Sequence, residues 1–276
     1  AVTDNGTILV TGSENSSGSF IAKTATDVTN LSVKIFVPRS DGSTPDNWKL
    51  VGIPVNGETV GDIDDNLATN GSKVGIGKWD HESNSWDLYT TSETASVLPS
   101  NVGYEMLYKA SGGDQLVTFS GSMVTSTTRD SRESVTNTWQ LLGNPYPSYV
   151  RMSSQATGAG SASNDYFFDT DNLNKVNASY QAFYGFDGNA YDTYAYNNTD
   201  VTLLMPGDAF FVYSGGFNTY QFNEAMQVHS SDQGFRGNVV QGGSDDDNRN
   251  AEIKFTMSDN YGTVKYLTMK FGDDFS

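Results

Sequence analysis

A seven-residue motif occurs twice in this chain, and this duplication constrains the fold more than any other feature. Residues 48–54 read Trp-Lys-Leu-Val-Gly-Ile-Pro and residues 139–145 read Trp-Gln-Leu-Leu-Gly-Asn-Pro. Four further landmarks follow each motif in the same order: residues 77–80 and 185–187, 98–104 and 205–208, 111–113 and 214–216, and 117–123 and 220–226. Self-similarity of this kind predicts two copies of one structural unit.

The motif residues have distinct expected roles. The tryptophan and leucine are expected to pack into a core, and the glycine to admit another backbone closely or to form a bulge. The proline ends strand pairing because it has no N–H to donate. These structural positions are Trp48, Gly52 and Pro54 in the first copy, and Trp139, Gly143, Asn144, Pro145 and Pro147 in or just after the second motif.

The rest of the chain has the pattern of short strands. Apolar and polar residues alternate at 31–37, 251–257 and 264–271, which is typical of strands with one buried face. Asn-Gly and Asp-Gly pairs punctuate these runs and favour tight hairpins. Helical periodicity is nearly missing. We therefore expect an all-β fold of tandem antiparallel β-sandwich units, jelly-roll or immunoglobulin-like, with a flanking strand set at each end.

The landmarks also predict an organisation along the chain. Residues 1–46 are expected to form an N-terminal β segment, 47–133 the first sandwich repeat, and 134–242 the second. Residues 243–276 open with the acidic run 245–248 and are expected to start a further β module that is cut short. The acidic run is the best linker candidate.

Charge, apolar run length and the absence of cysteine exclude several classes of partner and site. The chain has 33 acidic and 16 basic residues, for a formal net charge of −17. Nucleic-acid binding requires clustered Lys and Arg, so we expect no nucleic-acid partner. No apolar run is long enough for a transmembrane helix, so membrane insertion is not expected. There is no cysteine, hence no disulfide or thiolate site.

The second copy resembles a known family. Residues 139–148, Trp-Gln-Leu-Leu-Gly-Asn-Pro-Tyr-Pro-Ser, resemble a signature near the C-terminal ends of large surface proteins of the Bacteroidota. Residues 205–212 are similar to its companion Pro-Gly-Gln-x-Phe-Phe-Val strand, with Asp208 in place of the commoner Gln, and residues 224–229 to the Glu-Ala-Met-Gln-x-His stretch that follows. The first copy resembles the weaker partner that usually precedes it.

The resemblance implies a cargo of the type IX secretion system at the outer cell surface. Such proteins are adhesins, gliding-associated proteins or long enzymes with accessory modules. The expected partners are then the other domains of the same polypeptide and the type IX secretion machinery. No sorting domain is recognisable, so a C-terminal part is expected to be missing.

Catalytic chemistry is not indicated by the residues. A nucleophilic triad needs a base, usually His, and the only two are His81 and His229, without zinc-ligand spacing. A glycosidase needs two positioned carboxylates, and nothing in the sequence selects a pair. We expect a non-catalytic protein.

Calcium is the one cofactor that the acidic loops suggest, because it prefers hard oxygen ligands. The leading candidates are Asp169, Asp171, Asn172 and Asn174, followed by residues 245–248 and by Asp62, Asp64 and Asp65. None matches a complete EF-hand loop. The alternative is that these are solvated loop carboxylates with no cofactor bound.

Tyrosines cluster in the second copy and suggest glycan binding, because aromatic faces stack on sugars. The candidate residues are Tyr184, Tyr191, Tyr194 and Tyr196, with Tyr180 and Phe186 nearby. In a strand Tyr194 and Tyr196 would share a face. The alternative is core packing and cross-strand pairing.

Two functions follow. The first is a structural or adhesive module of a secreted cell-surface protein. The second is a carbohydrate-binding accessory module of a secreted polysaccharide-degrading enzyme. Exposed aromatics beside a groove would favour the second, and buried aromatics the first.

Overall fold

The computed structural model describes most of the chain. The described residues are 7–14, 17–22, 28–41, 47–124, 128–130, 137–156, 158–159, 165–188, 190–199, 201–216, 219–230, 251–258 and 264–271. Among them the regular structure is nearly all strand, so the expected all-β class is confirmed. The helices are single turns: α1 (Val60–Ile63), α2 (Thr170–Leu173) and the 3-10 turns η1 (Asp64–Asn66) and η2 (Glu224–Met226).

Each repeat builds an antiparallel sheet that begins with its motif strand. The first sheet has the order β3-β7-β5-β6, and the second has the order β10-β15-β12-β13. The strands of the first are β3 (Lys49–Gly52), β5 (Lys73–Asp80), β6 (Ser85–Thr90) and β7 (Gly103–Met106), with β4 (Thr69–Asn70) also paired to β5. Those of the second are β10 (Trp139–Gly143), β12 (Ala182–Phe186), β13 (Tyr191–Ala195) and β15 (Ala209–Tyr213).

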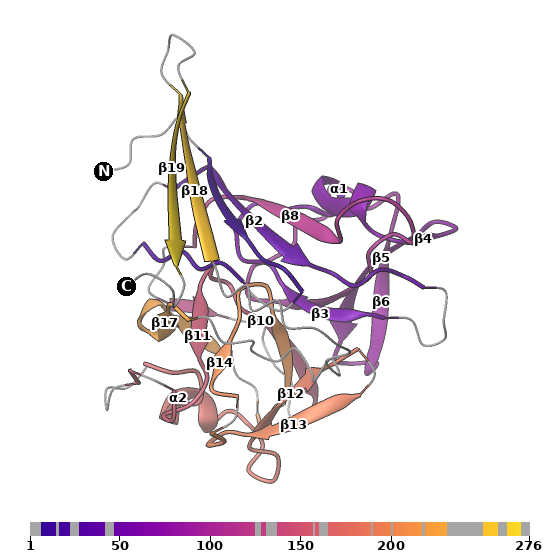
Figure 1. The fold of residues 1–276 in the computed structure, drawn as a ribbon. Coiled ribbons are helices and arrows are strands. Elements are labelled where there is room, and N and C mark those ends of the chain that lie inside the picture. The colour runs from indigo at the N-terminus through magenta and orange to yellow at the C-terminus, as the bar shows by residue number, and fades with distance from the viewer. Residues whose placement is uncertain are drawn as a thin grey trace, which may run out of the picture.

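Pairing registers show that the two sheets are copies of each other. Gly52 pairs with Gly103, and the corresponding Gly143 pairs with Ala209. In the next strand, Trp79 pairs with Trp86, as Phe186 pairs with Tyr191. The repeated unit of the sequence is therefore a repeated unit of structure (Figure 1).

The inner face of each motif sheet is covered by further strands, which form one sheet in the first repeat and two small sheets in the second. In the first repeat that sheet contains β2 (Leu31–Phe36) paired with β8 (Leu116–Gly121). In the second, β9 (Thr128–Asp130) pairs with β16 (Gln221–Asn223), and β11 (Tyr149–Arg151) lies between β14 (Leu203–Leu204) and β17 (Gln227–Val228). Strand β2 comes from the segment expected to precede the first repeat, and it pairs inside that repeat.

The flanking strands extend the first repeat. Strand β1 (Ile8–Thr11) runs parallel to β2 and antiparallel to β18 (Ala251–Ser258), which forms a hairpin with β19 (Val264–Phe271). The C-terminal hairpin, from the segment expected to start a further module, thus lies beside the N-terminal strand at the edge of the same sheet (Figure 1).

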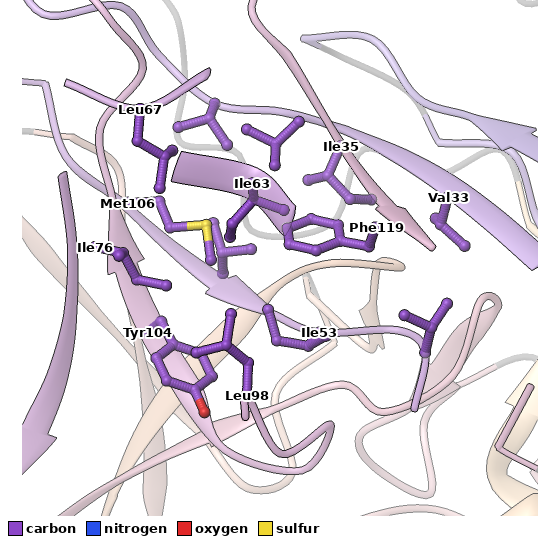
Figure 2. Packing of buried hydrophobic residues seen from close by; sticks show 14 of the residues in the cluster. Val33, Ile35, Ile53, Ile63, Leu67, Ile76, Leu98, Tyr104, Met106 and Phe119 are labelled. Carbon is purple, nitrogen blue, oxygen red and sulfur yellow. The ribbon is translucent and has the colours of Figure 1, made fainter. Parts of the chain in front are cut away.

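Each repeat has its own hydrophobic core. In the first, Val33, Ile35 and Phe119 of the β2-β8 pair pack against Ile76, Tyr104 and Met106 of the motif sheet (Figure 2). In the second, Phe167, Phe183, Phe210 and Phe222 form the centre of a core rich in aromatic rings. Alternation along the strands produces these cores because every second side chain faces the partner sheet.

Candidate functional site

The two motif strands touch through their glycines. A Cβ on Gly52 would lie 2.9 Å from the Cα of Gly143, and a Cβ on Gly143 would lie 2.8 Å from the Cα of Gly52. A Cβ on Gly143 would also approach the carbonyl oxygen of Val102 to 2.6 Å. Neither glycine has a positive φ, so close approach alone requires them. The motif glycine was expected to admit another backbone closely or to form a bulge, and the close approach is confirmed.

Backbone contacts across this junction occur in equivalent pairs. The Gly52 N–H donates to the Gly207 carbonyl at 3.1 Å, and the Gly143 N–H donates to the Asn101 carbonyl at 3.3 Å. Isolated bridges join Val51 to Asp208 and Leu142 to Val102. The sheet registers make these the same contact seen from each repeat, so the repeats are related by an approximate two-fold axis.

A third apolar cluster fills the junction between the outer faces of the motif sheets. We call it the junction cluster; its buried members are Leu50, Leu141, Ala209 and Phe211, and Trp79, Trp86, Trp139, Tyr184 and Phe186 pack against them partly buried. Phe211 lies at its centre, with ring centroids 5.1 Å from Trp79 and 6.3 Å from Trp139 in edge-to-face geometry. Edge-to-face pairs are favourable beyond the area they bury.

The approximate symmetry breaks at a tryptophan. Trp79 of the first repeat donates its indole N–H to the Trp139 carbonyl at 3.0 Å and closes its side of the junction. The equivalent residue in the second repeat is Phe186, whose smaller ring has no N–H to reach Trp48. The side of the junction at Trp48 therefore lacks this closing hydrogen bond.

A pocket of about 360 Å³ lies on that side. Its walls come from the end of β2 and the loop after it, from the start of β3, from the β12–β13 turn and from the residues before β15. The lining residues are Glu14, Phe36, Pro38, Arg39, Asn47, Trp48, Lys49, Leu50, Gln115, Phe186, Asp187, Gly188, Asp208 and Ala209. Pockets of this size with aromatic walls and a few polar groups are typical of small-ligand sites.

A buried ion pair lies in the pocket wall. The Lys49 Nζ is 3.6 Å from the Asp208 Oδ1 and donates to the Phe36 carbonyl at 3.1 Å. The Asp208 side chain is 5% exposed, and its Oδ2 accepts no hydrogen bond from the described residues. A fully buried carboxylate oxygen without a donor costs free energy.

A second buried carboxyl, that of Glu105, occupies the position in the first repeat that Phe211 occupies in the second. Glu105 pairs with Leu50 and Gly77, on the face of β7 that points to the junction cluster. Burial raises the pKa of Glu105 to about 8, and the nearby Glu105 also raises the pKa of Tyr191, after the larger effect of burial on that tyrosine.

The predicted tyrosines fall on two different faces. Tyr184 packs edge-to-face on Trp139, with 4.8 Å between centroids, and Tyr191 is 50% exposed beside Phe186 at 4.9 Å. Tyr194 instead stacks on Phe183 at 5.1 Å, and Tyr196 packs against the same second core. Tyr194 and Tyr196 share a face as expected, but that face is the core side.

The leading calcium candidates serve as a helix cap. Asp169 accepts the backbone N–H groups of Asp171 and Asn172 at 3.1 Å each. Asn172 is buried and donates to the carbonyls of Phe167 and Gln221, while Asp171 and Asn174 are exposed. This arrangement satisfies the first turn of α2 with side-chain acceptors.

The other described calcium candidates lie in the first two helical turns. Asp62 accepts both the N–H and the hydroxyl of Thr59 at the start of α1, and Asp64 and Asp65 lie in η1. Residues 245–248 lie outside the described residues. Within the described part of the chain, no three acidic or histidine side chains gather in a group that could hold a metal ion.

The family-like signature forms a buried polar turn. Asn144 is fully buried, donates to the carbonyls of Ser148 and Met205, and accepts the Tyr146 N–H at 3.0 Å. The Ser148 hydroxyl donates to the Gln227 Oε1 at 2.8 Å. Pro145 and Pro147 are buried in this turn, as Pro54 is in the first repeat. The two halves of the signature, far apart in sequence, thus bind each other.

The two histidines lie at the ends of different strands. His81 follows β5 in the turn to β6, and His229 follows β17 with its Nδ1 2.9 Å from the Ser19 hydroxyl. Burial lowers the pKa of His229. Among the described residues, no carboxylate pairs with His229 to complete a triad.

Sequence reasoning placed Trp48 among structural positions and missed Lys49, Arg39 and the pocket role of Asp208. Two signals were present. Asp208 departs from the glutamine of the family-like strand, and Lys49 stands where the second motif has Gln140. These two departures are the ion pair of the pocket wall.

In the described residues, helices are too short to cross a membrane. Comparison with protein-family models, with curated proteins and with solved structures finds no match to this chain.

Proposed function

We propose that this chain is a non-catalytic module of an exported bacterial cell-surface protein, with a structural and adhesive role. The observation that carries the proposal is the Gly52–Gly143 junction, which joins the two repeats through backbone contact. Such a joint suits a module that holds the other domains of a long polypeptide at fixed positions. The family-like signature supports export through the type IX secretion machinery.

The distribution of aromatic residues supports an adhesive role at the junction. Tyr191 is 50% exposed and lies 4.9 Å from Phe186, which lines the pocket together with half-buried Trp48. Exposed aromatic rings beside a cavity are typical of ligand-binding surfaces. The same observation favours the second candidate function, a carbohydrate-binding accessory module of a secreted polysaccharide-degrading enzyme.

Surface location is tested with antibodies against the purified chain, applied to intact cells of the source bacterium. The proposal expects labelling of intact cells that is lost when type IX secretion is disabled. Labelling only after lysis would contradict it.

The non-catalytic role is tested by incubating the chain with a panel of chromogenic glycosides and esters. Turnover by the wild-type protein that a carboxylate-to-amide variant abolishes would show an enzyme instead.

A further inference from the structure

We propose that the pocket at Trp48 is a binding site for one or two rings of a neutral sugar. This inference rests on the proposed adhesive role and names its ligand. The pocket, unlike the tyrosines singled out by the sequence, combines a concave volume with aromatic and polar walls.

The first argument is the state of Asp208. Lys49 holds its Oδ1 and fixes the carboxylate in the wall, where only 5% of the side chain is exposed. The Oδ2 accepts no hydrogen bond from the described residues. The Oδ2 is itself buried, so the carboxylate does not present a free negative charge to the pocket. The Lys49–Asp208 pair is therefore a fixed part of the wall and not a site for an ion.

The second argument is the balance of charge. Arg39 and Lys49 line the pocket together with the acidic Glu14, Asp187 and Asp208. The Arg39 guanidinium already donates to the carbonyls of Ala110 and Gly113. With Lys49 paired to Asp208, neither an anion nor a cation is strongly selected. A neutral ligand with several hydroxyls matches the mixture of donors and acceptors.

The third argument is the aromatic wall. Trp48, Phe36 and Phe186 contribute rings, and polar Asn47 and Gln115 lie in the same lining. Aromatic faces pack against the C–H faces of pyranose rings, while flanking polar groups bind the hydroxyls. A volume of about 360 Å³ suits one or two rings rather than a long chain.

The fourth argument is the contrast with the equivalent side of the junction. There the Trp79 indole donates to the Trp139 carbonyl at 3.0 Å. Phe186 occupies the equivalent position in the second repeat, next to Trp48. The pocket therefore exists where one repeat has a smaller ring than its copy. A tryptophan at position 186 is expected to reach the Trp48 carbonyl and fill the space.

The test is a glycan array that carries neutral mono- and disaccharides together with uronic-acid and amino-sugar glycans, probed with the whole chain. The free sugar with the strongest signal is then titrated by calorimetry. Phe186→Trp is expected to weaken binding at least tenfold without lowering the unfolding midpoint. Trp48→Leu is the second variant and should weaken binding at least as much. Tyr180→Ala, outside the pocket, is the matched control and should bind like the wild type.

Each outcome decides the proposal. Binding of a neutral sugar that both pocket variants weaken, with the control unchanged, supports it. Absence of binding to any neutral glycan overturns it, as does selective binding of charged glycans. Binding that survives in folded Phe186→Trp and Trp48→Leu places the site elsewhere and also overturns it. Surface labelling of cells does not depend on the pocket, so failure here is distinguishable from failure of the proposed function.

Discussion

Gly52 and Gly143, the same residue of two sequence repeats, lie back to back, with the Cβ position of one 2.9 Å from the Cα of the other. No other residue fits, because a Cβ on Gly143 would lie 2.6 Å from the Val102 carbonyl oxygen and a Cβ on Gly52 would lie 2.7 Å from the Asn144 nitrogen. The repeats are therefore joined by backbone contact as well as by the side chains of the junction cluster.

Gly143→Ala tests this contact. Its Cβ would overlap the Val102 carbonyl and Gly52, and neither neighbour is the flexible end of a side chain. We expect the free energy of unfolding to fall by about 3 kcal/mol, as for severe overpacking. Gly57→Ala is the control, because Gly57 has φ +93 and open space around it. The control should cost about 1 kcal/mol from backbone strain alone. Equal losses in urea denaturation would contradict the close-contact account.

Glu105→Gln tests the buried carboxyl at the junction. Burial raises the Glu105 pKa from 4.5 to about 8, so the folded state binds the proton more tightly than the unfolded state. The contribution of Glu105 to stability should then be largest below pH 4.5 and should fall as the pH rises from 4.5 to 8. The free energy of unfolding of the variant should exceed that of the wild type by an amount that grows above pH 5 and reaches about 2–4 kcal/mol by pH 9. Parallel stability curves for the two proteins would contradict the shifted pKa.

The control for that pH profile is Glu58. Burial also raises its pKa, to about 7, and Asp62 adds to the increase, so its carboxyl produces a loss of the same sign. Glu58→Gln should remove the part of the loss that ends near pH 7, whereas Glu105→Gln should remove the part that extends to pH 8. The difference between the two profiles separates the carboxyls.

Asn144→Ala tests the buried turn of the signature. The substitution leaves the Tyr146 N–H and the carbonyls of Ser148 and Met205 without the Asn144 amide. We expect a loss of about 3 kcal/mol, because each buried group left unsatisfied costs about 1–3 kcal/mol. Asn198→Ala removes similar but local loop hydrogen bonds and should cost about 1 kcal/mol. Comparable losses in thermal unfolding would show that Asn144 has no special structural role.

Tyr194→Ala and Tyr180→Ala separate core from surface tyrosines. Tyr194 stacks on Phe183 in the second core, so its truncation should cost about 2 kcal/mol. Tyr180 is 47% exposed, and its truncation should change stability by less than about 1 kcal/mol. A large loss for Tyr180 with none for Tyr194 would reverse the assignment of the two faces.

Local rules predicted much of this fold. Alternation identified β2, β18 and β19, and the Asn70-Gly71 and Asp187-Gly188 pairs are turns with positive φ at the glycine. The motif glycine was expected at a close backbone approach, and it lies at one. The strands and turns depend on residues near one another in sequence, whose preferences survive in the folded chain.

The site could not be predicted in the same way. Period-2 alternation shows that Tyr194 and Tyr196 share a face, but not whether that face is the core. The pocket brings Arg39, Trp48, Phe186 and Asp208 together from strands of both repeats, and it depends on the approximate two-fold axis. The copies differ at Trp79 against Phe186 and at Gln140 against Lys49. These differences indicate the pocket only once the pairing registers are known.

Differential scanning calorimetry of the whole chain tests most directly whether the two repeats form one body. If Gly52, Gly143 and the junction cluster couple them, the chain should unfold in a single transition whose calorimetric and van't Hoff enthalpies agree. Gly143→Ala should broaden or divide that transition. Two separate transitions in the wild-type protein, one for each repeat, would contradict the account.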